Sequence, residues 1–352
     1  MKKKILATIL AGTMALSLAA CGGSESTSAT TAAPAADSGS EAAEGGDAAE
    51  GGDTAAASDW KPEGTVSIVV PAGAGGDTDL SARVFAQYAK ELTGVDFIVV
   101  NSNGAAGSVA ANQVLESAPD GMTCLYGHAL VNVANIAGVT DYNYTAFKIG
   151  PSFALEPAQQ FYTFTDKYPD LDSFIEAAKA APGQLKACTE VGAYTYYELL
   201  GFEKAAGIDL DLVDAGSTSD KIAAMLSGQI DLMPGPYVNC KDYLETGDFT
   251  CIGVPTEERY DITKDLPTLK EQGIDYSYPN QEFSFYFPKE TPDEVITWYD
   301  NLVKQILDSE EGKQALADLQ MEPNYKSPAD TEKTEEETFN TIKAIADELE
   351  AQ

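Results

Sequence analysis

The sequence predicts an α/β protein. From residue 60 onward, short apolar and β-branched runs alternate with amphipathic helical patterns, as in parallel sheets covered by helices on both faces. Two glycine-rich loops, 71–76 and 101–107, each follow a predicted strand and precede a predicted helix. The chain of 352 residues is long enough for two domains of ordinary size.

Apolar periodicity places each element in turn. The first strand, 65–70, is β-branched and stops at the first glycine loop. The helix after it carries Leu80, Val84 and Tyr88 on one face and is closed by Gly94. The rest alternate as strand 97–100, a helix through 114–115, strand 123–126, helix 170–181, strand 185–189, helix 196–206, strand 210–213, helix 219–226, strand 230–233, and strand 283–287 followed by three helices.

The composition is that of an acidic globular protein. Lys and Arg number 22 against 56 Asp and Glu, which gives a formal net charge of -34. Such a surface repels a phosphate backbone, so nonspecific nucleic-acid binding is excluded. A hydrophobic content of 44% also excludes collagen-like and wholly disordered chains.

The first 59 residues have the pattern of an exported, tethered protein. Residues 1–20 combine a basic start, an apolar centre and small residues, as in a signal peptide. The cut site, Leu18-Ala19-Ala20-Cys21-Gly22, resembles the lipobox of bacterial lipoproteins, which implies that Cys21 carries acyl chains. The alternative is an ordinary signal peptide with a chance cysteine. Residues 21–59 contain no aromatic residue, which predicts a disordered tether.

Side chains suited to catalysis are few. His128 is the one histidine, and no Gly-x-Ser-x-Gly elbow accompanies it. The cysteines lack paired Cys-x-x-Cys spacing, so we expect no metal site, no cofactor and no enzymatic activity. Outside the cytoplasm Cys240 and Cys251 could form a disulfide, or they could be buried free thiols.

The two glycine loops suggest an anion site. Glycine lets the main chain approach a ligand, and free amides at a helix start favour a carboxylate or phosphate. A dinucleotide-binding loop is excluded because Gly73-Ala74-Gly75-Gly76 lacks the third glycine of that motif. A tight turn without a ligand is the alternative for either loop taken alone.

Several motifs that follow one another in a fixed order resemble those of a known protein family. They include Pro71-x-x-x-Gly75-Gly76-x-x-Asp79, Asn101-x-x-Gly104-x-x-Gly107 and Pro119-Asp120-Gly121, and the later strings AMLSGQIDLMPG and LPTLKEQGI. In this order the chain from 60 to 352 resembles the solute receptors of tripartite tricarboxylate transporters.

The resemblance implies a fold and a site. The fold is two-lobed, like the type II periplasmic binding proteins (a Venus flytrap), with a mixed sheet in each lobe. Carboxylates are held there by loop amides and bridging waters rather than by arginine. Asp79 could instead order its loop, and Arg83 could simply pair with it. The ligand-binding residues predicted in this way are Ala72, Gly73, Gly75, Gly76, Asp79, Asn103, Gly104, Gly107, Ser108, His128, Gly192, Tyr194, Thr195, Asp214, Gly216 and Ser217.

Lobe two departs from the family pattern. Tyr196 stands where the family usually has histidine, and Val213-Asp214-Ala215-Gly216-Ser217 replaces a stretch with an aromatic residue and a cation. Asp214 could face the ligand, which would then present an amine or hydroxyl, or it could face solvent. Tyr194, Tyr196 and Tyr237 could line the cleft or pack in the core.

The resemblance also implies a role. A monomeric, lipid-anchored, extracytoplasmic receptor would deliver a small di- or tricarboxylate, or an amino acid, to one large and one small integral membrane subunit driven by an ion gradient. The alternatives are a receptor of an ATP-driven importer and a surface hydrolase or adhesin. The predicted segments are signal 1–20, tether 21–59, lobe one 60–161 and 283–352, and lobe two 162–282.

Overall fold

The computed structural model describes residues 58–190 and 192–350, which belong to one compact unit. The predicted export signal, Cys21 and all but the last two residues of the predicted tether lie outside the described residues. Within the described part, no helix has the length and apolar character needed to cross a membrane.

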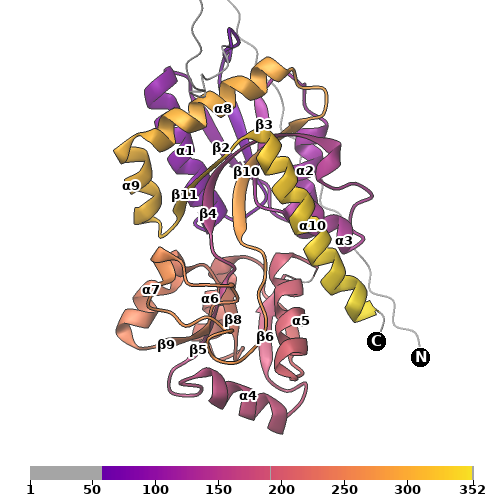
Figure 1. Cartoon of the computed structure of the whole chain (residues 1–352), viewed down its shortest axis with the longest axis vertical. Coiled ribbons are helices and arrows are strands. Elements are labelled where there is room, and N and C mark those ends of the chain that lie inside the picture. Colours follow the sequence, from indigo (N-terminus) through magenta and orange to yellow (C-terminus); the bar gives the residue numbers. More distant parts are fainter. Residues whose placement is uncertain (1–57, 191, 351–352) are drawn as a thin grey trace, which may run out of the picture. The chain divides into compact units, whose positions relative to one another are not determined.

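Lobe one is built on a six-stranded mixed sheet with the order β11-β4-β10-β3-β1-β2. The strand β1 pairs in parallel with β2 and β3, whereas β10 runs antiparallel to both β3 and β4. In Figure 1 the orange β10 lies among strands from the start of the chain. The strands are β1 (Val66–Val70), β2 (Phe97–Asn101), β3 (Thr123–Gly127), β4 (Phe147–Glu156), β10 (Gln281–Pro288) and β11 (Glu322–Lys326).

Lobe two contains strands of both orientations in two small sheets. A three-stranded antiparallel sheet has the order β8-β5-β9, and β6 pairs in parallel with β7. One parallel bridge, Ala187 to Leu232, joins the two sheets. The strands are β5 (Gln160–Phe164), β6 (Lys186–Thr189), β7 (Asp211–Asp214), β8 (Met233–Gly235) and β9 (Phe249–Gly253).

Helices cover both faces of these sheets. In lobe one, Phe85 of α1 and Tyr299 of α8 pack on Phe285 of β10 in one apolar core. In lobe two, Phe174 and Phe202 are fully buried in a second core. The helices are α1 (Asp77–Thr93), α2 (Ser108–Leu115), α3 (Leu130–Ile136), α4 (Leu171–Ala180), α5 (Tyr194–Ala206), α6 (Thr218–Leu226), α7 (Tyr237–Thr246), α8 (Asp293–Asp308), α9 (Glu310–Asp318) and α10 (Pro328–Glu350).

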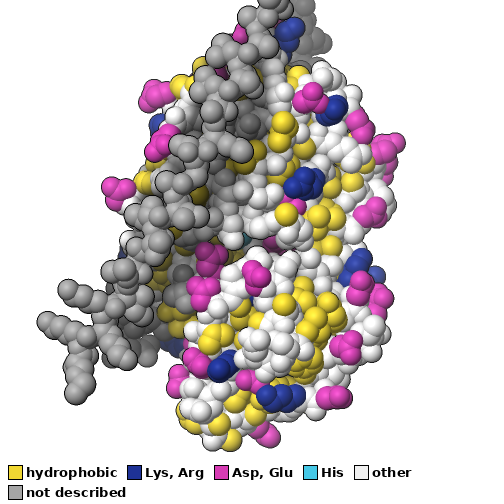
Figure 2. Space-filling view, turned by 180° about the vertical axis from the view of Figure 1, so that it is seen from behind, with side chains coloured by type: hydrophobic (Ala, Val, Ile, Leu, Met, Phe, Trp, Pro, Cys, Tyr) yellow, Lys and Arg dark blue, Asp and Glu magenta, His cyan; other side chains and the backbone are white. Residues whose placement is uncertain are grey.

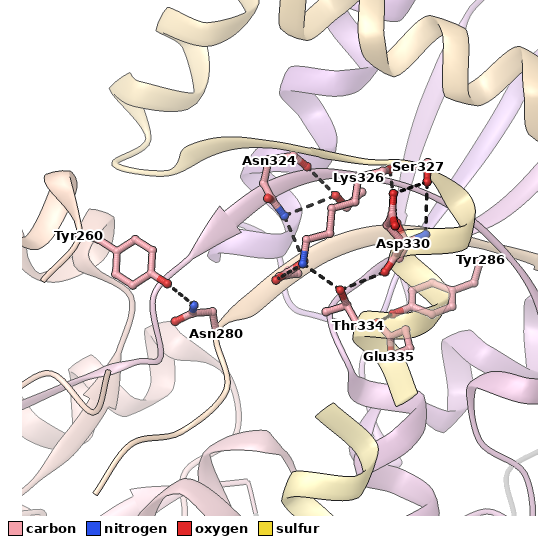
Figure 3. A network of polar contacts seen from close by, with 12 residues as sticks. Tyr260, Asn280, Tyr286, Asn324, Lys326, Ser327, Asp330, Thr334 and Glu335 are labelled. Carbon is pink, nitrogen blue, oxygen red and sulfur yellow. Dashed lines mark hydrogen bonds and ion pairs between the residues drawn. The ribbon is translucent and has the colours of Figure 1, made fainter. Parts of the chain in front are cut away.

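The long helix α10 contacts both lobes. Its first part lies against β4, and Figure 3 shows Glu335 next to Tyr286 of the large sheet. The sequence predicts residues 283–352 in lobe one, whereas Ile342 and Ala346 pack in the core that contains Phe202 of α5. The helix is long enough for its apolar stripe to be covered by one lobe and then by the other.

One strand is shifted from its expected position, and several elements were not expected from the sequence. The strand expected at 230–233 forms as β8 at Met233–Gly235, because Ile230 and Leu232 pack as core residues beside β6. The strands β4, β5, β9 and β11 and the helices α3 and α7 were not predicted. The sequence of β4, FKIGPSFALE, is almost continuously buried and contains Gly150 and Pro151, so it shows no strand alternation.

Candidate ligand-binding site

A cavity of about 100 Å³ lies where the two lobes meet. This volume has room for several water molecules or a small organic molecule. On the face shown in Figure 2, acidic side chains are widespread on both lobes. The cavity is lined by Pro71, Ala72, Gly73, Ala74, Gly76, Asp77, Thr78, Asn103, His128, Leu130, Gln159, Glu190, Ala193, Tyr194, Thr195, Gly216, Ser217, Thr218, Ser219, Lys221 and Gln281.

Three helices begin at this cavity. The first residues of α1, α5 and α6 all line it, so three positive ends of helix dipoles point toward one space. The N-cap residues of α1 and α5, Gly76 and Ala193, supply no side-chain cap. Main-chain N–H groups at an uncapped helix start are suited to bind a carboxylate or phosphate oxygen.

One basic side chain lines the cavity. Lys221 of α6 is only 7% exposed, and its Nζ donates to Thr195 Oγ1 at 3.3 Å. Lys221 is not among the site residues predicted from the sequence. The available signal was helical spacing, because Lys221 lies one turn after the predicted site residue Ser217 and therefore on the same face of α6.

Buried acidic groups lie at and behind the cavity wall. Asp77 is 6% exposed, while Glu156 and Glu198 are almost fully buried. Burial, and then the charge of Asp77, raise the pKa of Glu156 well above its usual value. Burial also raises the pKa of Glu198, although Lys221 opposes this effect. Both shifts favour the protonated, neutral form of the glutamates.

The histidine of the cavity is neutral. Burial lowers the pKa of His128 to about 4, against the opposing influence of Asp77. Its ring lies edge-on to Tyr194 of lobe two with 4.9 Å between centroids. Its Nδ1 has no hydrogen-bond partner in the described part of the chain. This nitrogen can donate to, or accept from, a ligand in the cavity.

Nine predicted site residues line the cavity and seven do not. The structure brings together Ala72, Gly73, Gly76, Asn103, His128, Tyr194, Thr195, Gly216 and Ser217. It places Gly75, Asp79, Gly104, Gly107, Ser108, Gly192 and Asp214 outside the lining. Of the other two tyrosines, Tyr196 packs on Tyr197 and Tyr237 begins α7, so neither lines the cavity.

Asp79 orders the first glycine loop. It accepts from Gly75 N at 2.9 Å, Arg83 Nη2 at 2.8 Å and Asn101 Nδ2 at 3.0 Å. Burial raises its pKa, but the bonds from Arg83, Gly75 and Asn101 outweigh burial and lower it. The structure therefore shows Asp79 ordering its loop and Arg83 forming an ion pair with Asp79.

Gly107 and Asp214 also have local roles. Gly107 has φ +85°, and a Cβ there would lie 3.3 Å from Leu130 Cβ, so backbone geometry and packing require glycine. Asp214 is exposed and accepts from Gly216 N at 3.1 Å, which shapes the turn before α6.

Cys124, Cys188, Cys240 and Cys251 are all buried free thiols. No group of three or more His, Cys, Asp or Glu suited to hold a metal ion occurs among the described residues.

Comparison with known proteins identifies the family. The profile described as tripartite tricarboxylate transporter family receptor matches residues 81–351. The chain belongs to this receptor family. A protein of Cupriavidus necator is 28% identical over 303 residues, covering 84% of this chain and 90% of its own, and one of Agrobacterium vitis is 28% identical over 251 residues, covering 67% and 69%.

Solved structures show the same fold. MatC of Rhodopseudomonas palustris, with bound malate, has a TM-score of 0.74 at 24% identity, covering 81% of this chain and all of its own. A second R. palustris protein, with adipate, has a TM-score of 0.75 at 25% identity, covering 82% and 98%. The chain therefore has the two-lobed fold of type II solute-binding proteins, and its family makes it a receptor.

Proposed function

We propose that this receptor binds a small carboxylated solute in the cavity between its lobes and delivers it to a membrane transporter. The observation that carries the proposal is the meeting of three helix N-termini and the buried Lys221 at one cavity. The starts of α5 and α6 and the buried Lys221 favour negative charge on the ligand, whereas the Asp77 carboxylate already lies at the start of α1. Malate in MatC and adipate in the second R. palustris protein support a carboxylate.

Closure of the two lobes would enclose the solute. We propose lobe one as 60–161 with 283–352, and lobe two as 162–282. The strands β4 and β10 lead from lobe one to the two crossings, and Gln159 and Gln281 at these crossings line the cavity. Contacts between the lobes already exist, such as Asn239 Nδ2 to Gly75 O at 3.2 Å.

The transport role supplies the remaining parts of the proposal. Signal 1–20 would direct export, and acylated Cys21 with tether 21–59 would hold the receptor at the outer face of the cell membrane. The partners would be one large and one small integral subunit driven by an ion gradient. The receptor itself would be a monomer without enzymatic activity.

A ligand screen tests the proposed function. Thermal unfolding of the chain from residue 58 would be followed with di- and tricarboxylates and amino acids, then calorimetric titration of any compound that raises the midpoint. A ligand at 100 times its Kd adds about 2.7 kcal/mol to the free energy of unfolding. A carboxylate that stabilises wild type but not Lys221→Met is the expected result. Stabilisation only by uncharged compounds would contradict the proposal.

A further inference from the structure

The charges that face the cavity do not suit a purely anionic ligand. Lys221, on lobe two, is the one buried cation of the lining, and Asp77, on lobe one, is a buried acid of the same lining. No Lys or Arg within the described ranges forms an ion pair with Asp77. A dianion bound here would leave Asp77 close to ligand charge of its own sign.

The two oxygens of Asp77 have different surroundings. Oδ1 accepts from Thr78 N at 2.7 Å. This bond and the positive end of the α1 dipole stabilise the negative charge on that oxygen. Oδ2 accepts from Gln159 Nε2 at 3.5 Å and Gln281 Nε2 at 3.4 Å, and the Asp77 carboxylate also interacts with the neighbouring buried carboxyl of Glu156. Both distances are at the outer limit of a hydrogen bond. Oδ2 therefore retains the capacity to accept a strong donor.

Two neighbouring acids are buried. Glu156 lies beside Asp77, its Oε1 accepts from Tyr237 N at 3.0 Å, and its Oε2 has no hydrogen-bond partner among the described residues. Burial raises the pKa of Glu156 and of Glu198 well above the usual value, which favours the protonated form of each. Asp77 of lobe one and Lys221 of lobe two are the opposed buried charges of the lining, and Glu190 is a further acid that lines it.

We infer that the solute is an amine-bearing carboxylate, such as an α-amino acid, whose ammonium group donates to Asp77 Oδ2 and whose carboxylate binds at Lys221 and the starts of α5 and α6. This inference rests on the proposed function and narrows its ligand class. The charges of a zwitterion match those of the cavity wall, and a buried charged hydrogen bond forms at each end. Asp77 then selects against the hydroxy acid and the unsubstituted acid of the same skeleton.

The first test compares ligands that differ at one carbon. Calorimetric titration of wild type would use succinate, malate and aspartate, then glutarate, 2-hydroxyglutarate and glutamate, then propionate, lactate and alanine. Within at least one series we expect the amino member to bind about tenfold or more tightly than the other two. The N-acetyl derivative of that member, which lacks the ammonium charge, should lose the same advantage.

The second test removes the proposed acceptor. Asp77→Asn keeps the size of the side chain and should weaken the amino member about tenfold or more, while the hydroxy member changes less than about threefold. Glu91→Gln makes the same change of charge at an exposed position of α1 and should alter neither. Circular dichroism would establish that each variant folds. The wild-type ligand series decides the question should Asp77→Asn fail to fold.

Several outcomes would overturn the inference. Equal or tighter wild-type binding of the hydroxy or unsubstituted acids would reject it and leave the proposed function standing. An equal loss for both ligand types in Asp77→Asn would show a structural role for Asp77. Dicarboxylate binding that requires sodium ions would show that a co-bound cation takes the ammonium position. Failure of every acid and amino acid to bind would reject the proposed function as well.

Discussion

The receptor has two buried polar regions that differ in how well their groups are partnered. At the cavity, His128 Nδ1 and Glu156 Oε2 have no hydrogen-bond partner in the described part of the chain, and the hydrogen bonds to Asp77 Oδ2 are long. In the second region, Glu335 of α10 is equally buried, but both of its oxygens have partners. Glu335 Oε1 accepts from the Tyr286 hydroxyl at 2.6 Å, and Glu335 Oε2 accepts from Asn132 Nδ2 at 2.7 Å.

The difference separates binding from structure. A buried polar group without a partner costs folding free energy, so such groups persist where a ligand completes them. A fully satisfied network fixes one arrangement of the chain instead. Figure 3 shows this second region, in which Lys326 of β11 lies between Asn324 and Thr334 of α10 and Tyr286 points to Glu335. We call the first region the cavity and the second region, which contains Asn132, Tyr286, Lys326, Thr334 and Glu335, the anchor.

The largest expected effect is at Gly73 of the cavity. A Cβ at Gly73 would lie 3.3 Å from Ser217 Cβ, so Gly73→Val should hold the lobes apart and reduce affinity more than about 100-fold. Unlike Gly107, Gly73 has no positive φ, so the substitution does not strain the backbone. Calorimetric titration would measure the loss. Gly64→Val, at an exposed glycine where a Cβ would meet only Met122 Cε at an ordinary contact distance of 3.9 Å, is the matched control, and unchanged affinity in Gly73→Val would place the site elsewhere.

Loss of the cavity cation comes next. Lys221→Met removes a charged hydrogen bond to the ligand carboxylate, which is worth about 1.5–3 kcal/mol, or about 10- to 150-fold in affinity. The unfolding midpoint without ligand should change little. Lys179→Met, an exposed lysine of α4, should have no effect on binding. Equal affinities for wild type and Lys221→Met would mean that helix amides alone hold the carboxylate.

The free energy of unfolding should depend on pH through the Glu335 carboxyl of the anchor. Burial raises the pKa of Glu335 from 4.5 to about 7, so the folded state keeps this proton to higher pH than the unfolded chain. This contribution to stability is fully present below pH 4.5 and is lost as pH rises to about 7, a change of up to about 3 kcal/mol.

Glu335→Gln isolates that effect. The free energy of unfolding of this variant minus that of wild type should increase between pH 4.5 and 7.5, as urea denaturation at several pH values would show. His128 acts in the opposite direction, because its pKa falls from 6.5 to about 4 on folding, but it is common to both proteins. A difference that stays constant with pH would mean that Glu335 titrates normally.

The smallest effect is expected from removing the anchor carboxyl entirely. Glu335→Leu leaves the buried Tyr286 hydroxyl without its acceptor and should cost about 1–3 kcal/mol of stability. Ligand affinity should remain within about threefold of wild type, because Glu335 does not line the cavity. Glu336→Leu, exposed on the same helix, is the control. A larger loss of affinity than of stability would show that the anchor is coupled to lobe closure.

Local sequence patterns were sufficient for the fold class and for part of the site. Alternating strands and helices predicted the α/β class, and the order of motifs indicated the family that the comparisons show. The glycine loop at 71–76 and the starts of α5 and α6 were predicted because strand, turn and helix signals are set by neighbouring residues. Ala72, Gly73, Gly76, Tyr194, Thr195 and Ser217 line the cavity, and their role in binding a ligand stays a prediction.

Long-range packing decided the rest. Lys221 faces the cavity because α6 docks beside Thr195 of α5, and nothing in the residues next to Lys221 specifies that neighbour. Glu156 and Glu198 are brought to Asp77 and Lys221 from strands and helices far apart in sequence, and burial in this arrangement raises the pKa of both glutamates. Asp79 and Gly107 belong to the family motifs, yet their side-chain bonds and φ angle make them supports of the loops rather than lining of the cavity. The charge of a site depends on which distant groups share its low-dielectric surroundings, and that is a property of tertiary structure.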